Sequence, residues 1–207
     1  MFLAILLIKE LLFLKHYYHR IAMLYPLKFI QKDICKDGSD HLFTYIYKFT
    51  LTETNLHYII RAEYHTENVF AVKFYSKKDR KSQYKYNKII NKNTYSSVIN
   101  ILETCTSLIP ILLEKHPNCS FALSSARSID FSNPKKLTEH LEENQRFRIY
   151  SRFIQERIGT STFTHLEYPT ISSYLLINNA EKDIDEKEKR ILEMFERTYQ
   201  TIPDITD

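Results

Sequence analysis

Residues 43–75 read FTYIYKFTLTETNLHYIIRAEYHTENVFAVKFY, and this stretch decides the fold. It contains three runs in which apolar or aromatic residues alternate with other residues, Phe43–Leu51, His57–His65 and Val69–Tyr75. Because successive side chains of a strand point to opposite faces, this alternation is typical of a sheet with one face in the core. The polar turns between the runs are short, as they are between antiparallel neighbours. The sequence therefore predicts a three-stranded antiparallel meander.

A long apolar helix is predicted after the meander. Apolar residues recur every three or four positions over Val98–Leu113, which places them on one face of an α-helix. Asn93 or Thr94 can cap its start, and Pro117 ends it because the residue before a proline avoids helical angles. Pro110 lies inside the pattern and lacks a backbone N–H, so we expect a kink there.

The rest of the chain alternates between short strands and helices. We expect a strand at Cys119–Ala126, a polar loop at Arg127–Glu143, a helix at Asn144–Ile158, strands at Phe163–Tyr168 and Ile171–Ile177, and a last helix from Ile184 to Tyr199. The predicted fold class is α+β, an antiparallel meander sheet with two or three packed helices in the order βββ-α-β-α-ββ-α. A length of 207 residues fits one α/β domain at 23–180 with an apolar N-terminal extension at 1–22 and a C-terminal acidic helix and tail at 181–207.

The N-terminal extension is apolar but too short for a spanning helix. The run Met1–Ile8 is broken by Lys9 and Glu10, whereas a spanning helix needs about 20 mostly apolar residues. No basic stretch precedes the run and no small-residue cleavage site follows it, so we do not expect secretion. Either residues 1–22 form an amphipathic helix, packed on the body or on a membrane surface, or Met23 is the true start. Membrane contact is the interpretation that we expect least.

Cysteine and glycine usage excludes several kinds of site. Cys35, Cys105 and Cys119 show no CxxC spacing, so neither a zinc knuckle nor a redox pair is indicated, and Cys105 falls on the apolar face of the long helix. Few cysteines in an odd number favour a reducing compartment, and we expect a cytoplasmic protein. Gly38 and Gly159 are the only glycines, whereas loops that hold phosphate on backbone N–H groups need several. A standard dinucleotide fold and a P-loop are therefore excluded.

The order of elements resembles a known family. Over Phe43–Asn178, and above all in Asn144-Gln-Arg-Phe-Arg-Ile-Tyr150, the chain is similar to the GCN5-related N-acetyltransferase fold. The resemblance implies acetyl-CoA as cofactor and Tyr150 as the catalytic residue that gives a proton to the departing thiolate. A similar run of elements also occurs in uncharacterised bacterial and phage proteins of unknown function.

The sequence departs from that family at the cofactor loop. The family carries a Gln/Arg-x-x-Gly-x-Gly/Ala run before its long helix, but residues 88–97 read KIINKNTYSS, without glycine. The spacing from Asn to Tyr is one residue shorter, and the Gly-Phe pair is displaced to Gly159 and Phe163. We therefore expect the architecture without a bound cofactor, and acetyl-CoA is the alternative.

The most basic segment is the first candidate for anion binding. Lys77–Lys92 carries seven basic residues against Asp79 alone, with Tyr84 and Tyr86 interleaved, a composition that suits phosphate contact and base stacking. A solvated loop whose tyrosines pack on the core explains the same composition. The candidate anion-binding residues here are Lys77, Lys78, Arg80 and Lys81.

A second group of basic residues follows the strand at Cys119–Ala126. It consists of Arg127, Arg146, Arg148 and Arg152. Arg148 and Arg152 are four residues apart, so they share one helical face and could hold one anion between two planar donor groups. Surface pairs with Glu142, Glu143 and Glu156 are the alternative explanation.

No metal site is predicted. His57 and His65 share a strand face, but eight residues separate them by about 26 Å, and the other histidines show no HxxxH spacing. Glu63 has a strand position that a catalytic base occupies in some acyltransferases, but we expect it to be an ordinary exposed carboxylate.

Three functions remain open. The first is a non-catalytic binding or regulatory domain, on a degenerate acyltransferase-like scaffold, whose basic residues face an anionic partner such as a nucleic acid, a nucleotide or an acidic protein surface. The second is an acyl-CoA-dependent N-acyltransferase with Tyr150 as its general acid. The third is a protein–protein interaction module whose charges only keep it soluble. We expect the first.

Overall fold

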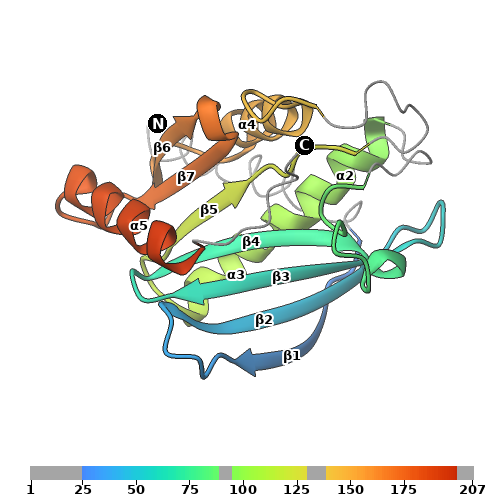
Figure 1. Cartoon of the computed structure of the whole chain (residues 1–207), viewed down its shortest axis with the longest axis horizontal. Helices are drawn as coiled ribbons and strands as arrows, with labels where there is room; N and C mark the ends of the chain where they lie inside the picture. The colour runs from blue at the N-terminus through green and yellow to red at the C-terminus, as the bar shows by residue number, and fades with distance from the viewer. Residues whose placement is uncertain (1–24, 89–94, 130–138, 200–207) are drawn as a thin grey trace, which may run out of the picture.

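The computed structural model describes residues 25–88, 95–129 and 139–199. In these residues the chain is an α+β fold, a mostly antiparallel seven-stranded sheet with helices against both faces (Figure 1). The strands are β1 Lys28–Ile34, β2 His41–Thr50, β3 His57–His65, β4 Val69–Ser76, β5 Ser120–Ser124, β6 Phe163–Tyr168 and β7 Ser173–Asn178. The helices are α2 Tyr95–Thr106, α3 Leu108–Lys115, α4 Gln145–Arg157 and α5 Ile184–Thr198, with short 3₁₀ turns η1 Lys77–Asp79 and η2 Pro169–Ile171.

The predicted meander is confirmed as β2, β3 and β4, but the predicted order is incomplete. A further strand, β1, pairs antiparallel with β2 and forms the edge of the sheet. All seven of its residues are exposed, and its register shifts between Phe29 and Gln31. An exposed edge strand needs no alternation, because neither of its faces has to be apolar, so the periodicity of the sequence did not reveal it.

The sheet changes direction between β4 and β5, which are its one parallel pair in the described residues. The spatial order is β1-β2-β3-β4-β5-β7-β6. β4 and β5 share only three register positions, from Val69 opposite Ser120 to Ala71 opposite Ala122. β4 then continues to Ser76 without a strand on that side, so the two strands separate toward their C-terminal ends.

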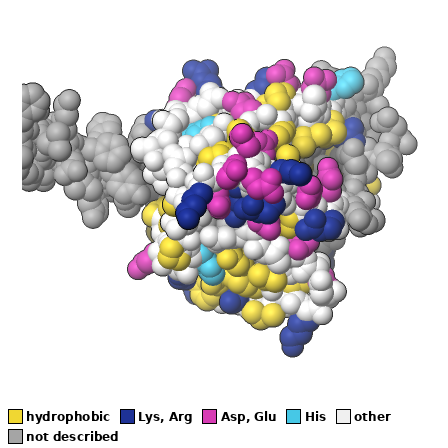
Figure 2. Space-filling model, turned by 90° about the vertical axis from the view of Figure 1, so that its left-hand side faces the viewer, with side chains coloured by type: hydrophobic (Ala, Val, Ile, Leu, Met, Phe, Trp, Pro, Cys, Tyr) yellow, Lys and Arg dark blue, Asp and Glu magenta, His cyan; other side chains and the backbone are white. Residues whose placement is uncertain are grey.

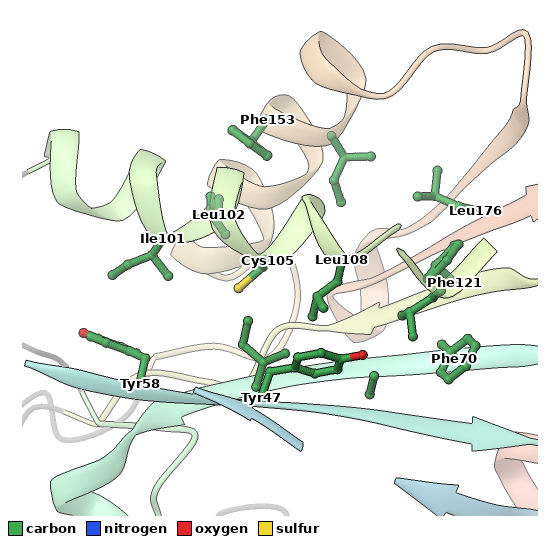
Figure 3. Packing of buried hydrophobic residues seen from close by; sticks show 14 of the residues in the cluster. Tyr47, Tyr58, Phe70, Ile101, Leu102, Cys105, Leu108, Phe121, Phe153 and Leu176 are labelled. Carbon is green, nitrogen blue, oxygen red and sulfur yellow. The ribbon is translucent and has the colours of Figure 1, made fainter. Parts of the chain in front are cut away.

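The main core lies between the sheet and helices α2, α3 and α4 (Figure 3). The alternating residues of the meander supply the sheet side, and Phe121 and Leu176 extend it to β5 and β7. Ile101, Leu102 and Cys105 supply the helix side. The named residues of β5, β7 and α2 are each less than a tenth exposed, which confirms the buried role of Cys105. Most of the predicted inner face of the meander is also buried, whereas Tyr45, Tyr64, Val72 and Phe74 are partly buried.

The long helix is interrupted near the expected kink. α2 and α3 are separated by Ser107, whose backbone still has right-handed helical angles. Pro110 has no N–H to donate to the carbonyl of Thr106, and its ring crowds that carbonyl. The helical hydrogen bond between these two positions is therefore missing, and the helix is interrupted beside Thr106. Within the described ranges, Ser96–Lys115 is a helix long and apolar enough to cross a membrane. A core helix passes the same test, and one face of this helix is buried on the sheet.

Helix α5 covers part of the opposite face of the sheet. Ile191 and Met194 pack on Val69 of β4 and on Leu175 and Ile177 of β7. Asp183 caps the helix, since its side chain accepts a hydrogen bond from the backbone N–H of Glu186. The predictions for Met1, Met23, Asn93 and Thr94 lie outside the described residues.

Candidate functional site

The end of β4 presents four basic side chains to solvent. Directly after Ser76 the chain turns through η1, and this places Asp79 inward, where it accepts a hydrogen bond from Lys88 Nζ at 2.9 Å. The side chains of Lys77, Lys78, Arg80 and Lys81 are exposed. None of these four forms an ion pair with another residue of the described ranges. We call them the basic turn.

The segment that follows the basic turn is fastened to helix α4. Arg146 donates hydrogen bonds from Nη1 to the carbonyl of Tyr86 and from Nη2 to the carbonyl of Lys88, the second at 2.8 Å. Asn87 donates from its side chain to the carbonyl of Arg127, at 3.0 Å, and its own carbonyl accepts from the N–H of Ile129. Residues 84–88 thus run beside the chain that leaves β5, near the point where β4 and β5 have separated.

The second predicted group of arginines lies on two faces of α4 and after β5. Arg146 holds the backbone of residues 84–88, whereas Arg148 and Arg152 point from another face of α4. Arg148 donates to the carbonyl of Glu143, and Arg152 pairs with Glu156 at 3.0 Å with both side chains more than half exposed. Arg127 follows β5, as expected. Local pairs therefore account for much of this group.

Tyr150 faces the sheet from α4. Its ring lies 6.1 Å from that of Phe74 on β4, and the residue is half-buried. Burial raises the pKa of Tyr150 to about 12, although the charge of Arg146 opposes this. The phenol therefore keeps its proton at neutral pH.

Glu63 is not the exposed carboxylate that the sequence suggested. It is 6% exposed and accepts hydrogen bonds from Arg61 Nε at 3.2 Å, Lys73 Nζ at 2.6 Å and Tyr199 Oη at 2.9 Å. Burial alone would raise its pKa, but the charge and hydrogen bond of Lys73, the hydrogen bond of Tyr199 and the charge of Arg61 together lower the pKa to about 2. The carboxylate is therefore ionised, and it is covered by the end of α5.

His65 joins the same network. Its Nε2 is 2.9 Å from Tyr199 Oη and its Nδ1 is 3.0 Å from the carbonyl of Glu63. Burial, followed by the charge of the stacked His41, lowers the pKa of His65 to about 4, so the ring is neutral at pH 7. Sequence reasoning missed this network, although Arg61, Glu63 and His65 recur at every second position of one strand.

The acidic C-terminal helix lies away from the basic turn. Helix α5 is beside the β3–β4 connection, where Arg190 pairs with Glu67 at 3.0 Å, and Arg197 reaches Asp40 at 3.3 Å. Figure 2 shows the side of the molecule on which α5 lies, and there Lys and Arg side chains are mixed with Asp and Glu. The basic turn follows the other end of β4, and the C-terminal end of α5 reaches β4 at Lys73, four residues before Lys77. Within the described ranges, no carboxylate of α5 forms an ion pair with the basic turn.

Neither a metal cluster nor a relative identifies the protein. Over the three described ranges, no group of three or more His, Cys, Asp or Glu residues could hold a metal ion. Comparison of the chain with models of protein families, with curated proteins and with solved structures found no match. The class that the fold defines is thus an α+β domain with a mostly antiparallel sheet.

Proposed function

We propose that this protein is a non-catalytic binding domain that takes an anionic partner on the basic turn. The observation that carries the proposal is the inward position of Asp79. Asp79 is the one acidic residue of Lys77–Lys92, and it forms an ion pair with Lys88. The four residues of the basic turn are therefore left without an acidic partner among the described residues. Four exposed cations within five residues raise the local concentration of anions and speed the association of an anionic partner with this surface.

The surroundings of the basic turn support recognition by side chains. Residues 84–88 are held by Arg146 and Asn87, so the turn begins at a strand and is followed by an anchored segment. Anchoring of the neighbouring backbone reduces the backbone entropy that is lost when the turn binds a partner. No glycine occurs between β4 and α2, so a tight backbone cradle for phosphate is not offered there.

An acyl-CoA-dependent N-acyltransferase is the second candidate, and two observations favour it. β4 and β5 are parallel and separate after three register positions, and Tyr150 keeps its proton beside Phe74 of β4. However, residues 84–88 run beside the ends of these strands. Stabilisation of the full chain by millimolar acetyl-CoA in a thermal shift assay would support this candidate, because a ligand of the folded state raises Tm by mass action.

A protein–protein module is the third candidate. The edge strand β1 and its neighbour expose Phe29, Ile30, Ile34 and Leu42, each at least 40% exposed. Hydrophobic side chains also gather toward the lower border of the face in Figure 2, at the level where Figure 1 draws β1 and β2. An exposed strand edge is a common place for pairing with another chain.

Binding of a single-stranded DNA oligonucleotide, with poly-glutamate as an acidic peptide probe, tests the first proposal. Affinity should fall linearly with salt on logarithmic axes, by about 0.7 in slope for each phosphate contacted. The variant with Lys77, Lys78, Arg80 and Lys81 all changed to Gln should lose affinity and flatten this slope by about 3.

A matched variant controls for net charge. Lys28, Lys36, Lys182 and Lys189 are also exposed and are placed on β1, after β1 and around α5. Changing these four to Gln removes the same charge and should leave the affinity and slope close to those of the wild type. Equal losses in both variants, or no binding of either probe at low salt, would refute the proposal.

A further inference from the structure

Two like charges face each other on neighbouring strands. Arg61 of β3 and Lys73 of β4 are register partners, on the face of the sheet where Tyr199 also lies. Like charges directly opposite each other destabilise a sheet, so such a pair needs negative charge nearby. Glu63 contacts both, but a single carboxylate neutralises only one of them.

A third cation, Lys85, lies over the ring of Tyr75, the next residue after Lys73 on the same face of β4. Lys85 Nζ is 5.2 Å from the ring centroid of Tyr75 and 5.3 Å from that of Tyr86. Tyr75 is two residues after Lys73, on the same face of β4. Burial, followed by the charge of Arg61, lowers the pKa of Lys85, and the charge of Glu63 opposes this. No carboxylate within the described segments pairs with Lys85.

The cations retain donors that can reach a ligand. Arg61 has five N–H groups, of which Nε bonds to Glu63 and Nη2 to Thr44 Oγ1, so donors of its planar group stay available. The side chains of Arg61 and Lys73 are 27% and 33% exposed. They are therefore partly accessible and partly desolvated, and partial desolvation strengthens their attraction for an anion.

We infer that Arg61, Lys73 and Lys85 form a binding site for a phosphate or phosphoryl group, separate from the basic turn. Three cations around one carboxylate leave two uncompensated positive charges, and a doubly charged phosphate neutralises them. Arginine binds phosphate with two parallel N–H donors, and lysine adds a point charge. The site goes beyond the proposed function and does not depend on it, because none of the three residues belongs to the basic turn.

Titration of the full chain with inorganic phosphate by isothermal calorimetry, at pH 7.5 and constant ionic strength, tests the site. The wild type should show saturable binding at one site. Lys85→Met should weaken the affinity about tenfold or more, because it removes a charge-assisted contact without breaking a described ion pair. The matched control Lys182→Met removes an exposed lysine beside α5 and should bind as the wild type does. Glu63→Gln should bind phosphate more tightly, since the competing carboxylate charge is gone.

A parallel titration with adenosine 5′-monophosphate identifies the source of the phosphoryl group. Tighter binding of the nucleotide than of phosphate assigns the site to nucleotides, and equal or weaker binding assigns it to free phosphate. The site is refuted if neither ligand saturates the wild type at millimolar concentration, or if Lys85→Met binds phosphate as well as the wild type does. The basic-turn variant should keep its affinity for phosphate, so failure of this site and failure of the proposed function are distinguishable.

Discussion

Replacing the buried carboxylate of Glu63 should destabilise the protein in a pH-dependent way. Contacts with Lys73, Tyr199 and Arg61 lower its pKa from 4.5 to about 2. That shift corresponds to a contribution of about 3 kcal/mol to the free energy of unfolding. Removing one partner of a buried ion pair typically lowers the free energy of unfolding by about 3–5 kcal/mol, a range that agrees with the contribution derived from the pKa shift. We expect Glu63→Gln to lower the unfolding free energy at pH 7 by about 3 kcal/mol.

The sign of the pH dependence follows from the lowered pKa. The contribution is complete above pH 4.5, where the carboxyl would be ionised in the unfolded chain as well, and is lost as pH falls toward 2. Urea unfolding of wild type and variant between pH 7 and pH 3 should therefore show two curves that converge on acidification. Glu156→Gln is the control, because its pair with Arg152 is exposed and should contribute at most about 0.5 kcal/mol. A Glu63→Gln variant as stable as this control, or a deficit that does not shrink below pH 4.5, would show that the network does not stabilise the fold.

Two further predictions concern groups near the same sheet. His65 has a folded-state pKa of about 4 against 6.5 in the unfolded chain, so the unfolded state binds more protons between these values. The unfolding free energy of the wild type should therefore fall by about 3 kcal/mol as pH falls from 6.5 to 4, and that of His65→Gln should not show this fall. Both profiles can be measured by urea unfolding, and parallel profiles would contradict the assignment. Asn144 caps α4 by accepting from Phe147 N–H and also donates to the carbonyl of Ser125, so Asn144→Ala should cost about 2 kcal/mol or more. The exposed cap Asp183→Ala should cost about 1 kcal/mol, and an equal Tm for both variants would argue against the second contact.

Periodicity determined much of the fold because burial of one face has to be written into the sequence. The meander, the helix interrupted near Pro110, and helices α4 and α5 follow from apolar spacing. β1 escaped because its seven residues are exposed and carry no such constraint.

The basic turn was also visible in the sequence, as a run of cations with one acid. The inward contact of Asp79 with Lys88 was not visible, because the two residues are nine positions apart and meet only through the turn. The net charge that the basic turn offers to a partner therefore depends on the pair between Asp79 and Lys88, which the composition alone does not predict.

By itself the sequence determined which residues alternate, where helices begin and end, and that no glycine loop can hold a phosphate. Only the tertiary structure decided which polar residues are buried together. Arg61, Glu63 and His65 have the strand parity of a solvent-facing row, and Lys73 and Tyr199 come from distant parts of the chain. The burial of a charge depends on what covers it, and here the end of α5 covers Glu63 across a separation of 136 residues.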